Sequence, residues 1–194
     1  MGDLVKLAIF SLTYNQTSQL MSSLLSNYDP TIRPVIDQSK VVTITALMLL
    51  GAIRTVNEKE QTISIRLYCW IWWEDELLTW TPSDHGNITA ISPQIQQLLV
   101  DTSEITPVYV NYTGTVVWAP NILLEQLCKM DMTKFPMDEH NCTFLIYSVG
   151  SSTSEISLQY AQKNLDLRQY TVNGEWELLK TETSILTFDT GVSP

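Results

Sequence analysis

The sequence is poor in positive charge, in cysteine and in long apolar runs, and each shortage excludes a class of protein. Its 194 residues include 11 lysines and arginines against 21 aspartates and glutamates, a formal net charge of −10. Nucleic-acid binding requires a basic surface, so this balance excludes a nucleic-acid partner and suits a cationic ligand or simple solubility. The longest apolar stretch, residues 41–53, is too short and too interrupted to reach the roughly 18 residues of a membrane span.

Residue patterns for catalysis and metal binding are missing as well. The two histidines, His85 and His140, lie far apart in the sequence and lack the paired spacing of metal ligands. There is no nucleophile–base arrangement, phosphate-binding loop or carboxylate pair. We therefore expect a binding protein and not an enzyme, with no metal site and no cofactor.

The residues that are present fit one globular domain over residues 1–194. Hydrophobic residues make up 44% and charged residues 16%, which is ordinary for a folded domain of this length. Three cysteines allow one disulfide with one cysteine left over. Four N-x-S/T sequons favour a secreted chain and are candidate glycosylation sites: Asn15, Asn87, Asn111 and Asn141.

The pattern predicts one helix followed by many strands. Apolar residues at helical spacing predict an amphipathic helix over residues 18–27, which Asp29-Pro30 ends. Residues 63–73 alternate with a period of two and form the strongest strand signal, and Gly51 marks a bulge in the strand before it. Further strands are predicted over residues 41–53, 108–112, 115–118, 143–149, 155–160 and 175–187. Short strands separated by turns at Thr113-Gly114 and Asn173-Gly174 are typical of a β-sandwich.

The most informative segment runs from Cys128 to Cys142, with thirteen residues between the cysteines. A disulfide across this spacing would close a modest loop and stabilise the fold by roughly 3 kcal/mol. Phe135 would anchor that loop, and Pro136 suits a tight bend with a cis peptide bond. The alternative is a pair of unpaired core thiols, and spacing alone leaves both possibilities open.

The whole segment resembles the defining loop of the Cys-loop receptors, in which Phe-Pro-x-Asp lies between two cysteines thirteen residues apart. Other stretches resemble landmarks of the same family, in the family's order: residues 28–35, 56–61, 73–80, 114–120 and 173–178. The chain is thus identified as a member, similar to the ligand-binding domain of nicotinic acetylcholine and serotonin receptors or to soluble acetylcholine-binding proteins.

The resemblance implies an all-β, immunoglobulin-like β-sandwich of about ten strands with an N-terminal α-helix. It also implies an extracellular domain that assembles as a homopentamer and binds a small cationic amine between neighbouring subunits, in a cage of aromatic rings. In a channel subunit, the loop closed by Cys128 and Cys142 would rest on the membrane domain of the same chain. The sequence stops at Pro194, so the family's final strand is expected to be absent.

Three residues match positions on the complementary face of the family's ligand site. Tyr68 falls where the family places an aromatic on its second strand, and the alternative is a half-buried strand tyrosine. Trp118 lies near the strand that lines the same face, but it would equally suit the sandwich interior or the ring contact. Asp166 falls in an acidic loop that approaches the pocket, and the alternative is an exposed loop carboxylate.

The principal face departs from the family. Val149 stands where amine-binding relatives place a tryptophan, and Tyr147 should point to the opposite face of the strand. Residues 91–94 lack the tryptophan and the aspartate of the family's W-x-P-D block. These departures leave a second hypothesis open, a structural or modulatory subunit, or one with an unusual ligand. A third hypothesis, an unrelated adhesion module, predicts that Cys128 and Cys142 are not paired.

The remaining predictions concern single residues. Cys69 is in phase with the apolar positions of the alternating strand, which predicts a buried free thiol. Asn141, beside Cys142, lies at a sequon that many members of the family glycosylate.

Overall fold

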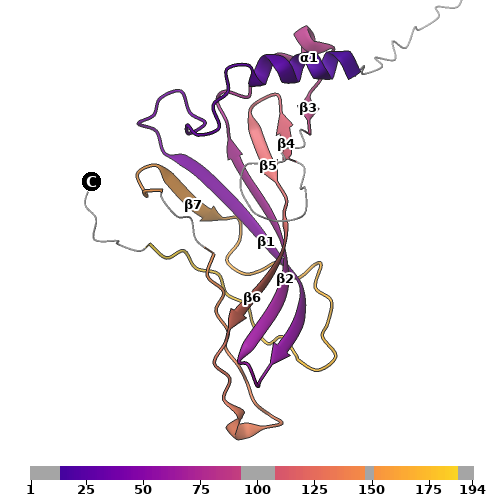
Figure 1. Cartoon of the computed structure of the whole chain (residues 1–194), viewed down its shortest axis with the longest axis vertical. Helices are drawn as coiled ribbons and strands as arrows, with labels where there is room; N and C mark the ends of the chain where they lie inside the picture. The colour runs from indigo at the N-terminus through magenta and orange to yellow at the C-terminus, as the bar shows by residue number, and fades with distance from the viewer. Residues whose placement is uncertain (1–13, 93–107, 147–150, 188–194) are drawn as a thin grey trace, which may run out of the picture.

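The computed structural model describes residues 14–92, 108–146 and 151–187, and in this part the fold is mostly β-sheet with one α-helix near the N-terminus. The helix, α1 (Tyr14–Leu25), caps one end of the molecule (Figure 1). It ends before Asp29-Pro30, as the sequence predicts, and it begins four residues earlier than expected. Leu20, on its apolar face, is fully buried.

Seven strands form one sheet around two long central strands. The order is β3-β4-β5-β2-β1-β7, and β6 pairs with β2 off this path. All pairings are antiparallel except that of β1 with β7. The strand bounds are β1 (Val42–Asn57), β2 (Thr62–Glu74), β3 (Ala90–Ile91), β4 (Val108–Asn111), β5 (Thr115–Trp118), β6 (Asn121–Leu127) and β7 (Ile156–Tyr160).

The hairpin of β1 and β2 runs most of the length of the molecule and carries the alternating pattern seen in the sequence. Gly51 lies at a register shift between Leu50 and Ala52, so the predicted bulge is confirmed. A side chain at Gly51 could not be accommodated in place, because a Cβ there would stand 2.6 Å from a ring carbon of Tyr68. The missing side chain lets the Tyr68 ring lie across β1.

Two separate clusters of buried residues form the core. Beneath α1, one cluster joins the helix to β3, β4 and β5, with Leu20, Leu78, Trp80, Ile88, Ile91, Val108, Val110 and Val116. Further along the hairpin, a second cluster lies on the inner face of β1 and β2, with Leu50, Ile65, Leu67 and Cys69. The hairpin thus connects two ends of the molecule that have distinct cores.

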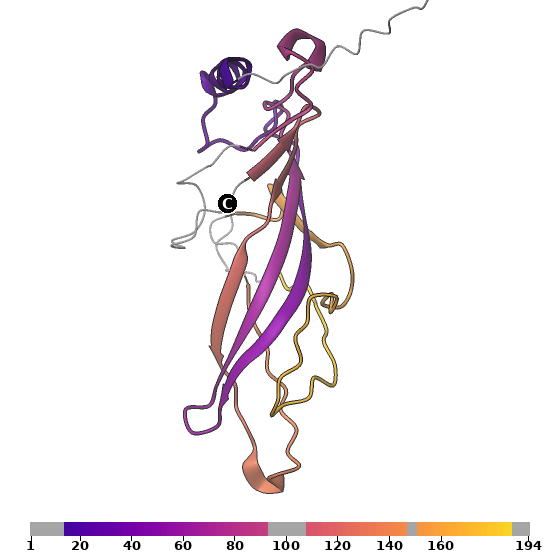
Figure 2. The same ribbon diagram turned by 90° about the vertical axis from the view of Figure 1, so that its right-hand side faces the viewer.

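Irregular segments cover the second cluster where the sequence predicted strands. Residues 143–146 and 175–187 form no strand, so those predictions are wrong for the described part, while residues 147–149 lie outside it. Their contacts are irregular: the Leu145 amide donates to the side chain of Gln126 (3.4 Å) and not to a neighbouring strand. The segments still cover the sheet, since Phe144, Leu165, Tyr170 and Leu178 pack against the second cluster. In Figure 2 residues 161–187, which follow β7, lie on one side of the hairpin.

A buried carboxylate organises the turn after β2. Asp75 is 1% exposed, and its carboxylate accepts hydrogen bonds from the Tyr28 hydroxyl (2.7 Å) and from the amides of Leu77 (2.9 Å) and Leu78 (3.2 Å). Burial raises the pKa of Asp75, and these three hydrogen bonds act in the opposite direction. Gly114 has a φ of 92°, and a Cβ there would stand 2.4 Å from the Asp75 carbonyl oxygen, so the predicted turn after β4 requires glycine.

None of the described helices is long and apolar enough to cross a membrane.

Candidate ligand-recognition face and disulfide loop

Tyr68 lies in the middle of β2 on the face that points away from the second core cluster. Its neighbours across the sheet are Leu49 on β1 and Asn121 on β6. The side chain is half-buried because its ring lies over Gly51. The location fits both meanings that the sequence left open, a site aromatic and a half-buried strand tyrosine.

Large apolar side chains flank Tyr68 on the same face. Trp70 is two residues along β2 and therefore points the same way, and it is 54% exposed. On β6, Leu123 and Leu127 stand opposite Arg66 and Thr62, which share the parity of Tyr68, and are 61% and 76% exposed. We call Tyr68, Trp70, Leu123 and Leu127 the outer aromatic face. Arg66 and Glu125 lie between these side chains on the same face, so the apolar residues are spread along it and do not form one continuous patch.

Asp166 reaches the other edge of β1 at the level of Tyr68. Its backbone accepts a hydrogen bond from Leu50 (3.0 Å) and donates one to Met48 (2.9 Å), and it pairs with Leu49. The side chain is 8% exposed, so the alternative of an exposed loop carboxylate is wrong. Hydrogen bonds from the side chain and the amide of Arg168 hold the pKa of Asp166 below its usual range.

Trp118 does not lie on the outer aromatic face. Trp118 pairs with Ile71 of β2 and packs partly buried against the core beneath α1, the interior position that the sequence left open. Val149 and Tyr147 lie outside the described residues.

The disulfide loop, residues 128–142, follows β6 and lies at the end of the molecule opposite α1 (Figure 1). Cys128 and Cys142 are bonded to each other, so the predicted pairing is confirmed and the adhesion-module hypothesis fails on this point. The Phe135-Pro136 peptide is cis, as the sequence suggested. Phe135 is 67% exposed and does not anchor the loop within the described structure.

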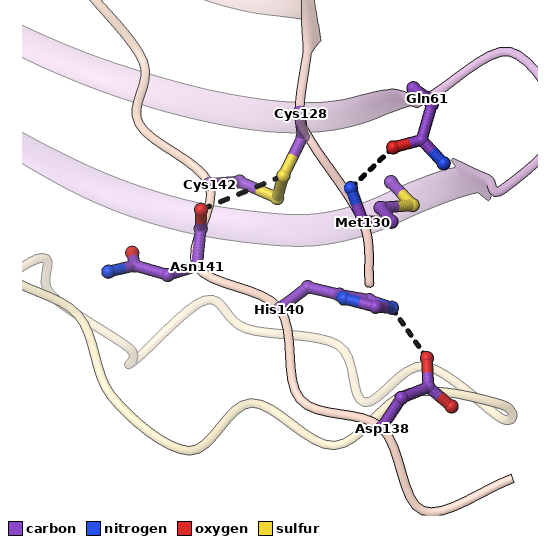
Figure 3. Close-up of a disulfide and its surroundings, with 7 residues drawn as sticks. All are labelled: Gln61, Cys128, Met130, Asp138, His140, Asn141 and Cys142. Carbon is purple, nitrogen blue, oxygen red and sulfur yellow. Dashed lines mark hydrogen bonds and ion pairs between the residues drawn. A yellow bond between two sulfur atoms is a disulfide. The ribbon is translucent and has the colours of Figure 1, made fainter. Parts of the chain in front are cut away.

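The loop is fastened at its base instead. The Met130 amide donates to the Gln61 side chain (2.5 Å) at the β1–β2 turn, as Figure 3 shows. A short 3-10 helix, η2 (Met132–Lys134), is capped by Asp131, whose carboxylate accepts from the Thr133 amide (3.0 Å). Within the loop, the buried side chains of Asp138 and His140 meet at 2.6 Å.

Cys69 is the free thiol, as predicted. It is 1% exposed within the second core cluster, and burial raises its pKa to about 11. A thiol with this pKa stays protonated and behaves as a small apolar side chain.

Two functional features escaped the sequence analysis. The close approach of Tyr68 to Gly51 depends on a cross-strand register that no local pattern reveals. The pairing of Asp138 with His140 joins residues two apart, but their burial depends on the segment that covers them. No group of three or more potential metal ligands is found among the described residues.

The sheet, the capping helix and the disulfide loop together define a receptor-type ligand-binding domain. Residues 17–193 match the family model of the neurotransmitter-gated ion-channel ligand binding domain, and the chain belongs to this family. Members are the ligand-gated channel receptors, pentameric and not enzymes, and this domain is their extracellular part.

Among its relatives, the chain is similar to subunits of acetylcholine receptors. It is 27% identical over 187 residues to the human acetylcholine receptor subunit gamma, covering 84% of this chain and 36% of the relative. It is 26% identical to the neuronal acetylcholine receptor subunit non-alpha-3 of Carassius auratus, with 82% and 37% covered. It is 27% identical to the neuronal acetylcholine receptor subunit beta-2 of Rattus norvegicus, with 79% and 33% covered. The chain thus spans about a third of the length of these relatives.

Proposed function

We propose that the chain recognises a small organic cation of the neurotransmitter type at the contact between neighbouring subunits of a homopentamer, and that its outer aromatic face is the complementary half of that site. The observation that carries this is the position of Tyr68 and Trp70, whose rings share one face of β2 among exposed apolar side chains. A ring face attracts a cation by about 0.5–2 kcal/mol, and the net charge of −10 favours a cationic ligand.

Asp166 supports the same site from the opposite edge of β1. Its carboxylate is already paired with Arg168, so it serves to hold the segment beside Leu49 and is not a free counter-ion for the ligand. Trp118 is proposed to support the site indirectly, through the strand pairing of β5 with β2. Val149 would belong to the principal half, which the neighbouring subunit contributes.

The same proposal covers the architecture. We infer a single extracellular domain over residues 1–194, an immunoglobulin-like sandwich of about ten strands in which the irregular segments over the second core cluster belong to the second layer. The contacts of Phe144 and Leu178 with that cluster support this arrangement. In a channel subunit, the disulfide loop would face a membrane domain of the same chain. The domain would act by binding and not by catalysis, without a cofactor.

Equilibrium binding of acetylcholine and serotonin, combined with light scattering for the mass, tests the proposal. Tyr68→Ala should weaken binding by roughly two- to thirtyfold, as loss of one cation–π contact predicts, and Tyr68→Phe should retain it. Tyr109→Ala is the control, because Tyr109 is an exposed tyrosine (47%) that lies on β4 and outside the outer aromatic face. A monomer that binds neither amine, or equal losses in Tyr68→Ala and Tyr109→Ala, would overturn it.

A structural or modulatory subunit is the second candidate, and the valine at position 149 favours it. Valine cannot offer a ring face to a cation. If the chain has lost amine binding for this reason, Val149→Trp should restore it. If the variant gains no binding, the modulatory role is favoured.

We also propose that the sequons are used. The side chains of Asn15, Asn87 and Asn141 are exposed, whereas Asn111 is half-buried and its carboxamide oxygen accepts three hydrogen bonds from Thr113 and Thr115. Expression in a secretory eukaryotic cell should give glycan mass at the three exposed sites, and each Asn→Gln variant should lose one glycan. Unmodified protein would contradict this.

A further inference from the structure

A buried pair of ionisable side chains lies where the disulfide loop meets the turn at residues 173–176. The side chains of Asp138 and His140 are 4% and 6% exposed, and the His140 Nε2 atom lies 2.6 Å from the Asp138 Oδ2 atom (Figure 3). On its other side, the imidazole contacts the Trp176 ring, with ring centroids 5.2 Å apart and planes tilted by 43°. His140 is therefore held between a carboxylate and an aromatic ring.

Neither imidazole nitrogen has a hydrogen-bond partner in the described part of the chain, and neither does Asp138 Oδ2. The close approach of Nε2 to Oδ2 lacks hydrogen-bond alignment, so it is an ion pair only when the imidazole is protonated. A neutral imidazole would leave a buried carboxylate without a counter-charge, which is costly. A proton taken up from solvent would supply that charge and would also turn the Trp176 contact into a cation–π contact.

We propose that His140 is a proton-dependent clasp that fastens the disulfide loop to the turn at residues 173–176. In the protonated state the imidazolium joins Asp138 to Trp176. Loss of the proton removes both attractions and loosens the contact. Histidine is the side chain that most often serves as a proton-dependent switch in proteins.

The loop that carries the clasp also holds charged side chains of both signs, Lys129, Asp131, Lys134 and Glu139. Asp131 is in the same loop, and its pKa is lowered chiefly by hydrogen bonds from Thr133 and further by the positive charges of Lys129 and His140. From the facing turn, Glu175 and Glu177 flank Trp176 in sequence.

The turn that holds Trp176 is also bound to β1, the strand that pairs with β2 beside Tyr68. The Asn173 carboxamide oxygen accepts from the Glu175 (2.8 Å) and Trp176 (2.9 Å) amides, and its nitrogen donates to the Ile53 carbonyl (3.1 Å) on β1. Seven residues earlier in the chain, Asp166 is bound to the same strand. His140 is thus a positioning residue, which would tie the segment from Asp166 to Trp176 to the disulfide loop. The importance of this link for ligand binding rests on the proposed function.

The clasp can be tested without any ligand, so it can fail while the proposed function stands. The full chain is labelled with 5-fluorotryptophan, and the fluorine line lost in Trp176→Phe identifies Trp176 among the six tryptophans. In the wild type we expect this line to move with pH along a one-proton curve. In His140→Gln, which is polar but carries no charge, the same line should be flat.

His85→Gln is the matched control, because His85 is the only other histidine and lies in the 3-10 helix η1 (Pro82–His85), beside α1 and remote from the clasp. This variant should keep the full titration of Trp176. If His140→Gln does not fold, the imidazole resonance that remains in His85→Gln reports the titration of His140 directly. A Trp176 line that does not move with pH in the wild type, or that still titrates in folded His140→Gln, would overturn the proposal.

Discussion

The helix end and the disulfide end of the molecule share the hairpin of β1 and β2, but they are stabilised by different interactions. At the helix end, α1 closes a compact apolar cluster in which Leu20, Ile88 and Val110 are at most 2% exposed. At the disulfide end, the covering segments form no strands: the disulfide closes the loop, the Asp138–His140 pair lies within it, and Asn173 binds its turn to β1. The β1–β2–β6 ladder continues into the disulfide end, but the segments that cover it there are held by individual contacts and not by ladders.

This difference suits the roles proposed for the two ends. A close-packed apolar core resists small displacements, because each shift opens a cavity. Segments joined by a few polar contacts can exchange one contact for another at lower cost, and elements that move on binding come from such regions. The comparison therefore predicts large, uniform losses of stability at the helix end and smaller, condition-dependent losses at the disulfide end.

The largest effect is expected for Leu20→Ala. The variant removes the most buried side chain of α1 and leaves a cavity between the helix and β3–β5, which should lower the free energy of unfolding by about 2–5 kcal/mol. Leu25→Ala, in the same helix but 47% exposed, should cost much less. Urea unfolding followed by tryptophan fluorescence measures both, and equal losses would show that α1 is not docked through Leu20.

Removal of the disulfide comes next. The double variant Cys128→Ser with Cys142→Ser opens the loop that the bond closes across a separation of 14 residues, and should cost roughly 3 kcal/mol. The reductant-treated wild type should unfold at the same urea concentration as the double variant. If the reduced protein keeps its full stability, the cross-link does not hold the disulfide end, and the contrast between the two ends would not hold.

The sequence predicts the hairpin strands and the disulfide better than the segments that cover the second core cluster, and the reason is physical. Alternation over residues 63–73 and the glycine turn at Gly114 are local signals, and both appear in the structure. Residues 175–187 have strand-like composition, yet they form no strand. Whether such a segment pairs depends on distant partners and not on its own sequence.

In the candidate site, too, some features follow from local sequence and others depend on tertiary packing. Tyr68 could be located by counting along β2 from Trp73, because the period of a strand fixes which side chains share a face. The support of its ring by Gly51, and the burial of Asp166 beside Leu49, depend on pairings between segments far apart in sequence. Those pairings follow from tertiary packing, so the sequence indicated the residues but not their surroundings.

Tyr28→Phe should give a pH-dependent loss. It removes the hydroxyl that donates to buried Asp75, and leaving that carboxylate short of one donor should cost about 1–3 kcal/mol at neutral pH. Because burial already raises the pKa of Asp75, the folded chain keeps this proton to higher pH than the unfolded chain. The contribution of Asp75 to stability therefore falls as pH rises from 3.8 through the raised value.

The hydroxyl of Tyr28 favours the ionised form of Asp75, so its removal raises the pKa of Asp75 further. Unfolding free energies of wild type and Tyr28→Phe should be close at about pH 3, where the carboxyl is protonated, and should separate as pH rises to about 7. A difference that is the same at both pH values would mean that Tyr28 stabilises the turn through packing and not through its hydrogen bond.

The smallest effect is expected for Asn173→Ala, at the disulfide end. The variant removes the acceptor for the Glu175 and Trp176 amides and the donor to Ile53, at a cost of about 1 kcal/mol, because water can replace partners that lie near the surface. Hydrogen exchange should accelerate at residues 173–176 and stay unchanged around Leu20. Asn121→Ala, which alters an exposed asparagine on β6, should change neither. In the described structure, the hairpin of β1 and β2 connects the disulfide end to the helix end. Faster exchange that also spreads to α1 would therefore mean that the two ends unfold as one unit.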